Sequence, residues 1–324
     1  MRPIAFYQSE FITFLRQQQF PDSPQKLYEP ISYILELGGK RMRPVLTLMA
    51  AELFGYGHEK ALPAAMAIEV FHNFSLIHDD IMDDAPLRRG EPTVHKKWNL
   101  NTGILSGDAM LIVSYQYLQQ YSGAMLEDVF RLFNKTAIEV CEGQQFDIDF
   151  ETRNDVTITE YLKMIEYKTS VLVGAALQMG AIVARSPEKD QRAIYEFGRN
   201  LGIAFQLQDD YLDAFGNPET FGKQVGGDII ENKKTYLYLK ALELAPDDDR
   251  LALVNFFSEY KGGNDEKVKA VKAIFKGCGA IAAIKEEIGS YTDKALKALG
   301  RIDAHTDGKE LFRQFAVQLM DREV

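Results

Sequence analysis

The chain has 324 residues, of which 46% are hydrophobic and 26% are charged, and its formal net charge at pH 7 is −10. This composition supplies enough apolar side chains for a large core and excludes an intrinsically disordered chain. The acidic balance argues against binding to nucleic acid, because no excess of Lys and Arg exists to neutralise a phosphate backbone.

The apolar residues recur every three or four positions along most of the chain, which predicts amphipathic helices rather than strands. The pattern is clear near residues 31–35 and 45–49, and long helical segments follow at 62–84 and 191–215. Breaks that contain Gly or Pro separate the helices at 38–39, 86–92, 186–187, 215–227 and 262–263. No linker or fixed-period repeat interrupts the pattern, so we expect one all-α domain over residues 1–324, built from about a dozen helices.

The cysteines and the apolar stretches indicate the cellular compartment of the protein and whether it spans a membrane. Cys141 and Cys278 fit no disulfide or zinc pattern, which favours a reducing, cytoplasmic compartment. Residues 1–10 contain polar side chains before a signal-peptide core can develop. The apolar stretch 171–184 falls short of the roughly 20 residues that a membrane span needs, so we expect a buried central helix and no span.

Two acidic runs with the same DDxxD spacing stand out. Asp79-Asp80-Ile81-Met82-Asp83-Asp84 ends the first long helical segment, and Asp209-Asp210-Tyr211-Leu212-Asp213 lies near the end of the second. In a helix the first and fifth carboxylates lie one turn apart, with Cβ atoms about 5–6 Å from each other, and repel unless cations sit between them. Such oxygen ligands suit Mg²⁺, which completes its coordination with water and substrate phosphates. The two runs therefore indicate a phosphorylated ligand.

Basic residues accompany the acidic runs. Lys40 and Arg43 follow a Gly-Gly pair, Arg88 and Arg89 follow the first run, and Lys168, Lys223 and Lys233 extend the set. The planar fork of Arg and the mobile point charge of Lys both suit diphosphate oxygens. One anion held through a metal and another held directly imply two substrates.

These motifs occur in one characteristic order. They are Gly39-Lys40-x-x-Arg43, the Asp79 run with Arg88-Arg89, Lys168-Thr169, Phe205-Gln206-x-x-Asp209-Asp210-x-x-Asp213, and Gly226-Gly227-Asp228. The chain, from about residue 30 to residue 240, resembles a trans-isoprenyl diphosphate synthase of the polyprenyl synthetase family. The resemblance implies a helical bundle around a central cavity, a homodimer, and Mg²⁺-dependent head-to-tail condensation of isopentenyl diphosphate with an allylic diphosphate (dimethylallyl, geranyl or farnesyl).

The resemblance also implies roles for the acidic residues. Asp79, Asp83 and Asp209 would bind Mg²⁺, with about three ions per active site bridging to the allylic diphosphate. Asp80, Asp84, Asp210 and Asp213 would orient these ions or their waters.

The basic and polar residues would divide between the two substrates. Those at the allylic diphosphate would be Arg88, Lys168 and Lys223, with Gln206 beside it and Lys233 as a further helper. Those holding isopentenyl diphosphate would be Lys40, Arg43, His72 and Arg89. Thr169 and Phe205 would border the reacting carbons, where a hydroxyl and an aromatic face stabilise transient positive charge.

Product length would depend on the residues that precede the first acidic run. Phe74 lies five residues before Asp79, roughly 7–8 Å away along a helix, where an aromatic ring would stop a growing hydrocarbon. Ser75 is small, and Phe71 lies one turn deeper as a second floor. A chain with an aromatic residue at this position resembles the short-chain synthases of the family. We therefore expect a farnesyl (C15) or geranylgeranyl (C20) product.

Several alternatives remain open from the sequence. A deeper floor would give a long-chain polyprenyl diphosphate synthase. A class I terpene cyclase also ionises an allylic diphosphate but needs no second diphosphate site, and a noncatalytic subunit would bind prenyl diphosphates without joining them. Taken alone, an acidic run is as often a solvated helix end as a metal site. His72 or Phe74, taken alone, would be ordinary core residues.

Overall fold

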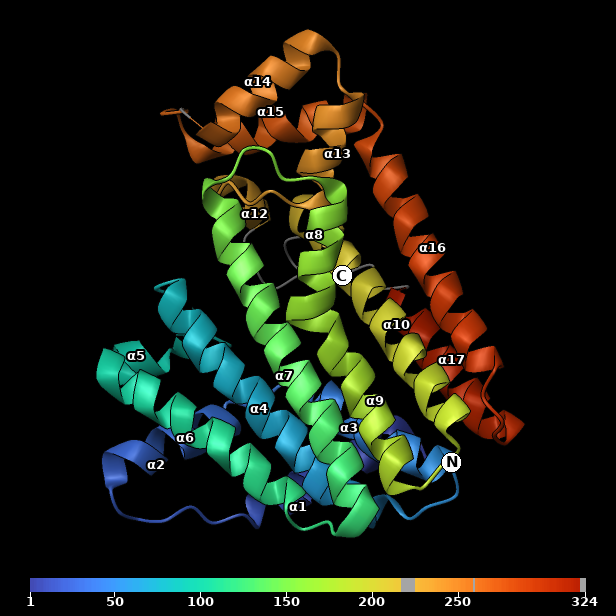
Figure 1. Ribbon diagram of the computed structural model, residues 1–324. Coiled ribbons are helices and arrows are strands. Elements are labelled where there is room, and N and C mark those ends of the chain that lie inside the picture. The colour runs from blue at the N-terminus through green and yellow to red at the C-terminus, as the bar shows by residue number, and fades with distance from the viewer. Residues whose placement is uncertain (217–224, 259, 321–324) are drawn as a thin grey trace. The chain divides into compact units, whose positions relative to one another are not determined.

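The computed structural model describes residues 1–216, 225–258 and 260–320, and this part of the chain is helical apart from one short hairpin (Figure 1). It contains 15 helices, 13 of them with seven or more residues, when residues 158–183 are counted as one helix. The prediction of an all-α fold is confirmed. No helix in these ranges combines the length and the apolar character that a membrane crossing requires.

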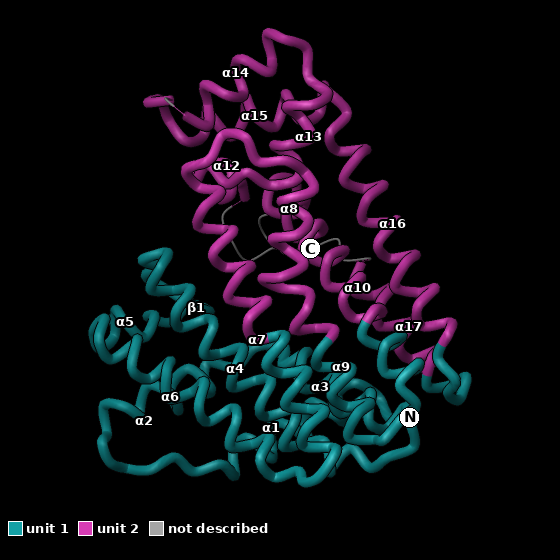
Figure 2. The backbone as a smooth tube through the Cα atoms, viewed as in Figure 1, with its two compact units in different colours: residues 1–136, 175–195, 302–308 teal, residues 137–174, 196–301, 309–324 magenta. Residues whose placement is uncertain are grey.

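The chain folds into two compact units (Figure 2). Unit 1 comprises residues 1–136, 175–195 and 302–308, and unit 2 comprises residues 137–174, 196–301 and 309–324. Four of the five boundaries fall inside helices, which are α7 (Gly123–Thr152), α9 (Val171–Val183), α10 (Glu188–Phe215) and α17 (Thr306–Met320), and the fifth lies between residues 301 and 302, before α17. That residues 1–324 form a single domain stays a prediction.

Unit 1 is built around helix α4 (Leu62–Met82), which packs against its neighbours α3 and α6. Pro63 lies in the first turn of α4, where its missing N–H costs nothing. Apolar side chains are buried on nearly all sides of the helix, which is the pattern of a central core helix. The other elements of the unit are α1 (Ile4–Arg16), α2 (Gln25–Glu36), α3 (Met42–Leu53), η1 (His58–Ala61), α5 (Val94–Lys97) and α6 (Leu100–Leu118).

A small antiparallel hairpin follows α4 and was not predicted. Its strands are β1 (Leu87–Arg88) and β2 (Glu91–Pro92), with Arg88 opposite Glu91. Arg89 and Gly90 form the turn with φ values of 55° and 84°. Two consecutive residues with positive φ match the right-handed twist of the strands. The hairpin therefore fixes the position of the Arg88 backbone, from which its side chain extends.

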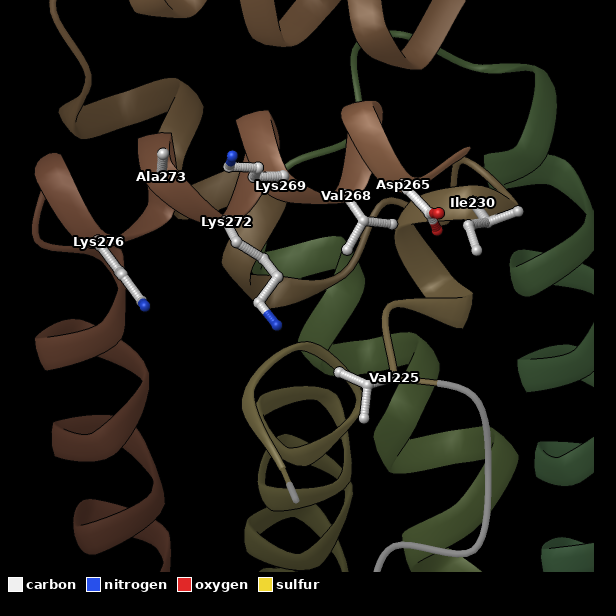
Figure 3. A pocket seen from close by; sticks show the side chains of 8 residues that line it. All are labelled: Val225, Ile230, Asp265, Val268, Lys269, Lys272, Ala273 and Lys276. Carbon is white, nitrogen blue, oxygen red and sulfur yellow. The ribbon is translucent and has the colours of Figure 1, made fainter. Parts of the chain in front are cut away.

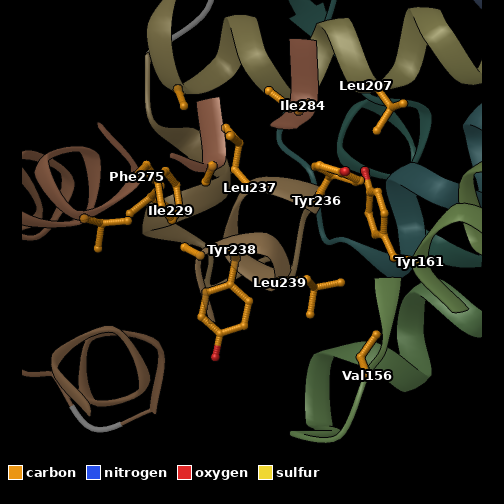
Figure 4. Close-up of a cluster of buried hydrophobic side chains, with 14 of the residues drawn as sticks. Val156, Tyr161, Leu207, Ile229, Tyr236, Leu237, Tyr238, Leu239, Phe275 and Ile284 are labelled. Carbon is orange, nitrogen blue, oxygen red and sulfur yellow. The ribbon is translucent and has the colours of Figure 1, made fainter. Parts of the chain in front are cut away.

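Unit 2 has its own core, formed by buried side chains from most of its helices (Figure 4). The core includes Tyr161, Leu207 and Tyr236, and it surrounds the last turns of α10. The elements that belong wholly to this unit are α8 (Ile158–Ile165), η2 (Glu166–Ser170), α12 (Gly227–Ile230), α13 (Tyr236–Leu244), α14 (Asp247–Ser258), α15 (Asn264–Gly277) and α16 (Ala280–Gly300).

Residues 158–183 form one continuous helix with an irregular turn. The helix begins with a capping box, in which Thr157 accepts from the Glu160 amide and Glu160 accepts from the Thr157 amide. Its η2 segment, Glu166–Ser170, is a π-helical turn, a feature that is rare and often found at functional sites. The following segment α9 is almost wholly apolar and buried, as the sequence predicts for the stretch 171–184.

Candidate active site

The first acidic cluster, Asp79, Asp80, Asp83 and Asp84, lies at the end of α4. Asp84 adopts a left-handed conformation with φ of 49°, and the amide of Ala85 donates to the carbonyl of Asp80 at 2.9 Å. The amide of Asp84 donates to the carbonyl of Ile81 at 3.3 Å, which completes a Schellman motif. The helix therefore stops within the acidic run, as predicted, and Asp83 is exposed there.

Asp80 differs from its neighbours because it is buried and paired with Arg88. The Arg88 Nε donates to both Asp80 carboxylate oxygens, at 2.8 and 2.9 Å, and the Arg88 Nη2 lies 3.3 Å from Asp79 Oδ2. Burial raises the pKa of Asp80, and Arg88 counteracts this effect. Asp80 therefore fixes the guanidinium of Arg88 beside Asp79, a direct contact between two residues that the sequence assigns to the same substrate.

Asp84 points elsewhere. Its Oδ1 lies 2.6 Å from Lys96 Nζ and 3.6 Å from His95 Nε2, and the side chain is exposed. Its lysine partner holds the pKa of the carboxyl below the ordinary value. Together with its left-handed backbone, this pairing makes Asp84 part of the helix end, and its role toward a metal stays a prediction.

The basic loop, residues 38–43, connects α2 to α3 and carries Lys40 and, in the first turn of α3, Arg43. Lys40 is exposed, whereas the Arg43 Nη1 lies 3.0 Å from His72 Nε2 on α4. The side chain of Arg89 donates to the carbonyl of Gly38. Gly39 has φ of +108°, and a Cβ there would lie 2.8 Å from Arg89 Cζ, so only glycine permits this approach. The structure thus gathers all four residues predicted to hold isopentenyl diphosphate.

Two buried polar atoms of this group have no partner in the described part of the chain: Arg43 Nε and His72 Nδ1. Arg43 is half-buried, and burial lowers its pKa while the charge of Glu69 raises it. Burial and the neighbouring charge of Arg43 lower the pKa of His72 well below its ordinary value, so its ring is neutral. Buried donors without partners are costly unless a ligand satisfies them, which fits an anion site.

The predicted chain-length residues lie on α4 before the acidic cluster. Phe74 has 9% of its surface exposed and packs against Phe71 and His78, with ring centroids 5.5 and 4.8 Å away. Phe71 is fully buried and contacts Phe133 at 5.2 Å. Ser75 donates its hydroxyl to the carbonyl of His72 and is part-buried. The rings contact one another at tilted or edge-on angles, so both predicted floors belong to one packed column.

The second acidic cluster, Asp209, Asp210 and Asp213, lies in the last turns of α10. Asp210 is buried and accepts a hydrogen bond from the hydroxyl of Tyr161. Burial and the nearby Asp228 raise the pKa of Asp210 well above its ordinary value, whereas Tyr161 lowers it. Asp213 accepts from the amide of Asp228 at 3.1 Å. The hydrogen bond ties the start of α12 (Gly227–Ile230) to the cluster, and an added cation would relieve the crowded negative charge.

Lys168 and Thr169 lie on the π-helical turn η2. The Lys168 Nζ pairs with Asp147 Oδ2 at 2.6 Å, and the Thr169 hydroxyl donates to Gln206 Oε1 at 3.4 Å. A Cβ at Gly143 of α7 would lie 2.1 Å from the backbone nitrogen of Lys168, so the turn rests directly on that glycine. The turn therefore holds Lys168, Thr169 and Gln206 near one another, as the predicted allylic site requires.

The remaining residues predicted at the allylic substrate make fewer contacts with the residues described above. Phe205 is half-buried on α10, next to Gln206. Lys233 is exposed and lies 3.2 Å from Glu231; burial lowers its pKa, but the carboxylates of Glu231 and Asp228 outweigh that effect and raise it. Lys223 lies outside the described residues, and its predicted contact stays a prediction.

The carboxylates of the two clusters suit a divalent cation only together with further ligands. Within residues 1–216, 225–258 and 260–320, no three His, Cys, Asp or Glu side chains are grouped closely enough to hold a metal ion alone. Mg²⁺ is usually held by one or two carboxylates together with substrate phosphates and water. The two carboxylate clusters fit Mg²⁺ that arrives with a diphosphate, and they do not form a complete protein cage.

A surface groove of about 440 Å³ lies in unit 2 between α15 and the segment 225–230 (Figure 3). Lys269, Lys272 and Lys276 line one side of it. None of its eight lining residues belongs to either acidic cluster or to the predicted substrate contacts. The groove is therefore not the candidate active site.

Some residues of the site were missed from the sequence. Asp147 and Tyr161 support Lys168 and Asp210, and Arg41 and Glu69 form a buried pair behind the basic loop. Arg41 stands inside a motif that was recognised, so its position was a usable signal. Asp147, Tyr161 and Glu69 lie in ordinary helical patterns, and only the fold shows their partners.

Comparison with known proteins gives a consistent result. The family model described as polyprenyl synthetase matches residues 24–275. The chain is 37% identical over 302 residues to the geranylgeranyl diphosphate synthase of Methanosarcina mazei, covering 93% of this chain and 91% of that one.

Solved structures agree. A crystal structure of a geranylgeranyl pyrophosphate synthase is 52% identical, covers 100% of both chains and superposes with a TM-score of 0.96. A polyprenyl synthase from Caulobacter crescentus CB15, crystallised with calcium and isoprenyl diphosphate, is 26% identical with a TM-score of 0.87 and covers 99% of this chain and 96% of that one. The predicted isoprenoid synthase-like fold is confirmed.

Proposed function

This chain belongs to the polyprenyl synthetase family, and we propose that it joins isopentenyl diphosphate to an allylic diphosphate to make a short-chain all-trans product, geranylgeranyl diphosphate (C20). The proposal is supported by two groups of residues that suit diphosphates, in a chain that matches the polyprenyl synthetase family model. One consists of carboxylates suited to Mg²⁺, and the other consists of the cations Lys40, Arg43 and Arg89 together with the neutral ring of His72.

The proposed reaction breaks the allylic carbon–oxygen bond and forms a bond between that allylic carbon and the terminal alkene carbon of isopentenyl diphosphate, which leaves a tertiary cation at C3 of the isopentenyl unit. A proton then passes from C2, the carbon next to this cation, to the released diphosphate, and the new double bond forms. Mg²⁺, about three ions per site, would be held by Asp79, Asp83 and Asp209 and would supply Lewis-acid stabilisation of the leaving diphosphate. Asp210 and Asp213 would orient these ions or their waters. No protein nucleophile is needed.

The side chains act by holding charge and excluding water. Arg88, held by Asp80, and Lys168, held by Asp147, would present cations to the leaving diphosphate. Gln206, which accepts from the Thr169 hydroxyl, would lie beside that diphosphate. Thr169 and Phe205 would border the reacting carbons, where a hydroxyl oxygen and an aromatic face stabilise positive charge. The apolar column of Phe74 and Phe71 would keep water from the cation.

The test is incubation of purified protein with labelled isopentenyl diphosphate and each allylic starter (dimethylallyl, geranyl or farnesyl), with Mg²⁺ or with a chelator. Product length is then measured after phosphatase treatment. Mg²⁺-dependent C20 alcohol is expected, and long alcohols would assign a long-chain synthase. Cyclic hydrocarbons would assign a terpene cyclase, and binding without condensation would assign a noncatalytic subunit.

We also propose that the protein acts in the cytoplasm as a homodimer that pairs through α6. Ile104, Leu105 and Ile112 are 40%, 58% and 58% exposed on that helix. Their spacing places them on one stripe of the helix, and apolar stripes on a surface are typical of contact sites. Ile112→Glu should halve the mass measured by light scattering. Leu251→Glu, a control on α14 where the side chain is 71% exposed, should leave the mass unchanged.

A further inference from the structure

Arg41 stands in the middle of the basic loop, yet its side chain turns inward. It is the residue before α3 and has a left-handed backbone with φ of 50°. Its surface is only 6% exposed, although both Lys40 beside it and the adjoining Gly39 are exposed. A non-glycine residue in this conformation is uncommon and persists only where surrounding contacts hold it.

The contacts of Arg41 join three elements of unit 1. Its guanidinium donates to the carbonyl of Leu35, in the last turn of α2, and to Glu69 Oε1, in the middle of α4. The side chain of Glu69 is as deeply buried as that of Arg41, with 3% and 4% exposed. Asn73, one turn further along α4, donates to Glu69 Oε1 at 3.1 Å. A buried and hydrogen-bonded charge pair of this kind fixes geometry more than it adds stability.

The same pair is the centre from which the predicted isopentenyl diphosphate contacts extend. Glu69 Oε2 lies 4.0 Å from His72 Nδ1, and His72 Nε2 lies 3.0 Å from Arg43 Nη1. Because Arg can only donate, His72 Nε2 accepts and the proton resides on Nδ1, which faces Glu69. The charge of Glu69 also raises the pKa of Arg43 against the effect of burial. Glu69 is thus a buried counter-charge within the cation group.

We propose that Arg41, through its pair with Glu69, is a positioning residue for isopentenyl diphosphate: it fixes the basic loop against α4, so that Lys40 and Arg43 present their charges to the diphosphate. The inference rests on the proposed function. Arg41 itself is turned away and does not touch the substrate. The allylic contacts Arg88 and Lys168 do not depend on this pair, so its loss should affect one substrate only.

The test uses the double variant Arg41→Met/Glu69→Met, which removes both charges and replaces them with apolar side chains of similar length. Such replacements are tolerated in buried pairs, whereas removal of one partner leaves an unpaired charge. The KM for isopentenyl diphosphate should rise by about 10-fold or more, equivalent to losing one charge-assisted hydrogen bond. The KM for the allylic diphosphate should stay unchanged. Arg41→Lys, which keeps the charge, should recover part of the loss.

One control variant separates positioning from general stability. His58→Gln removes another buried polar side chain of unit 1, paired with Glu10 at 3.3 Å, and should lower the melting temperature without changing either KM. Equal changes in both KM values, or a fall in melting temperature alone, would overturn the inference. If the parent protein condenses nothing, the proposed function fails; calorimetric titration with isopentenyl diphosphate then still tests whether the double variant binds it more weakly.

Discussion

The aromatic column on α4 makes a quantitative prediction about product length. Phe74 lies five residues before Asp79, or about 7.5 Å along the helix, and Phe71 lies a further three residues and about 4.5 Å deeper. A five-carbon unit adds four carbons to the main chain, which extend about 5 Å at ordinary bond lengths. Phe74→Ala should therefore admit about one additional unit before Phe71 stops the chain, changing the main product from C20 to C25.

The assay is product analysis after phosphatase treatment, together with urea unfolding of the same samples. If Phe74 borders the hydrocarbon chain, the variant loses less than the roughly 3–5 kcal/mol typical of a core Phe→Ala change, because substrate rather than a void occupies the space. Phe71→Ala alone should leave product length unchanged, since Phe74 still blocks the path. Unchanged product length in a folded Phe74→Ala protein would refute the reasoning.

Three other changes test the site. Gly143→Ala brings a methyl group to 2.1 Å from the backbone nitrogen of Lys168, so it should destabilise the protein by about 1–3 kcal/mol and slow condensation. Thermal melting measures the loss of stability, and steady-state kinetics measure the rate of condensation. Gly277→Ala, where the added methyl group meets open space, is the control. Asp84→Gly should keep stability within about 1 kcal/mol, because glycine suits the left-handed position; weaker Mg²⁺ dependence of the rate would instead show that Asp84 serves the metal. The pKa of His72 is depressed by burial, so the unfolded chain takes up the proton first. Its contribution to the unfolding free energy should fall below pH 6.5 by at most about 1.4 kcal/mol per pH unit. Denaturant titrations at two pH values should show that His72→Asn removes this part; an unchanged slope would contradict it.

The sequence predicts the helices and the acidic ends well because those features are periodic and local. The segments 62–84 and 191–215 became α4, ending at Met82, and α10, beginning at Glu188. The DDxxD spacing also identified where the charged residues gather, because it reflects one turn of helix.

Other features depend on contacts between distant segments. Arg41 and Lys40 are neighbouring basic residues, but only the fold shows that one is buried against Glu69 while the other is exposed. The pairing of Lys168 with Asp147 spans 21 positions and leaves no local mark. The π-helical turn likewise has no hydrophobic period of its own, so the sequence does not predict it.

The interleaving of the two units has a consequence for synthesis of the protein. Each unit draws on three stretches of the chain, and unit 1 includes residues 302–308, which are made long after its first stretch, residues 1–136. Neither unit can complete its set of residues until the chain has been made beyond residue 300, although domains of other proteins commonly fold while the rest is being made. A nascent chain would therefore hold residues 1–136 of unit 1 for much of translation without the two later stretches, 175–195 and 302–308, that complete the unit. Fragments that stop before residue 300 would lack part of both units, which makes chaperone dependence a natural property to examine during expression.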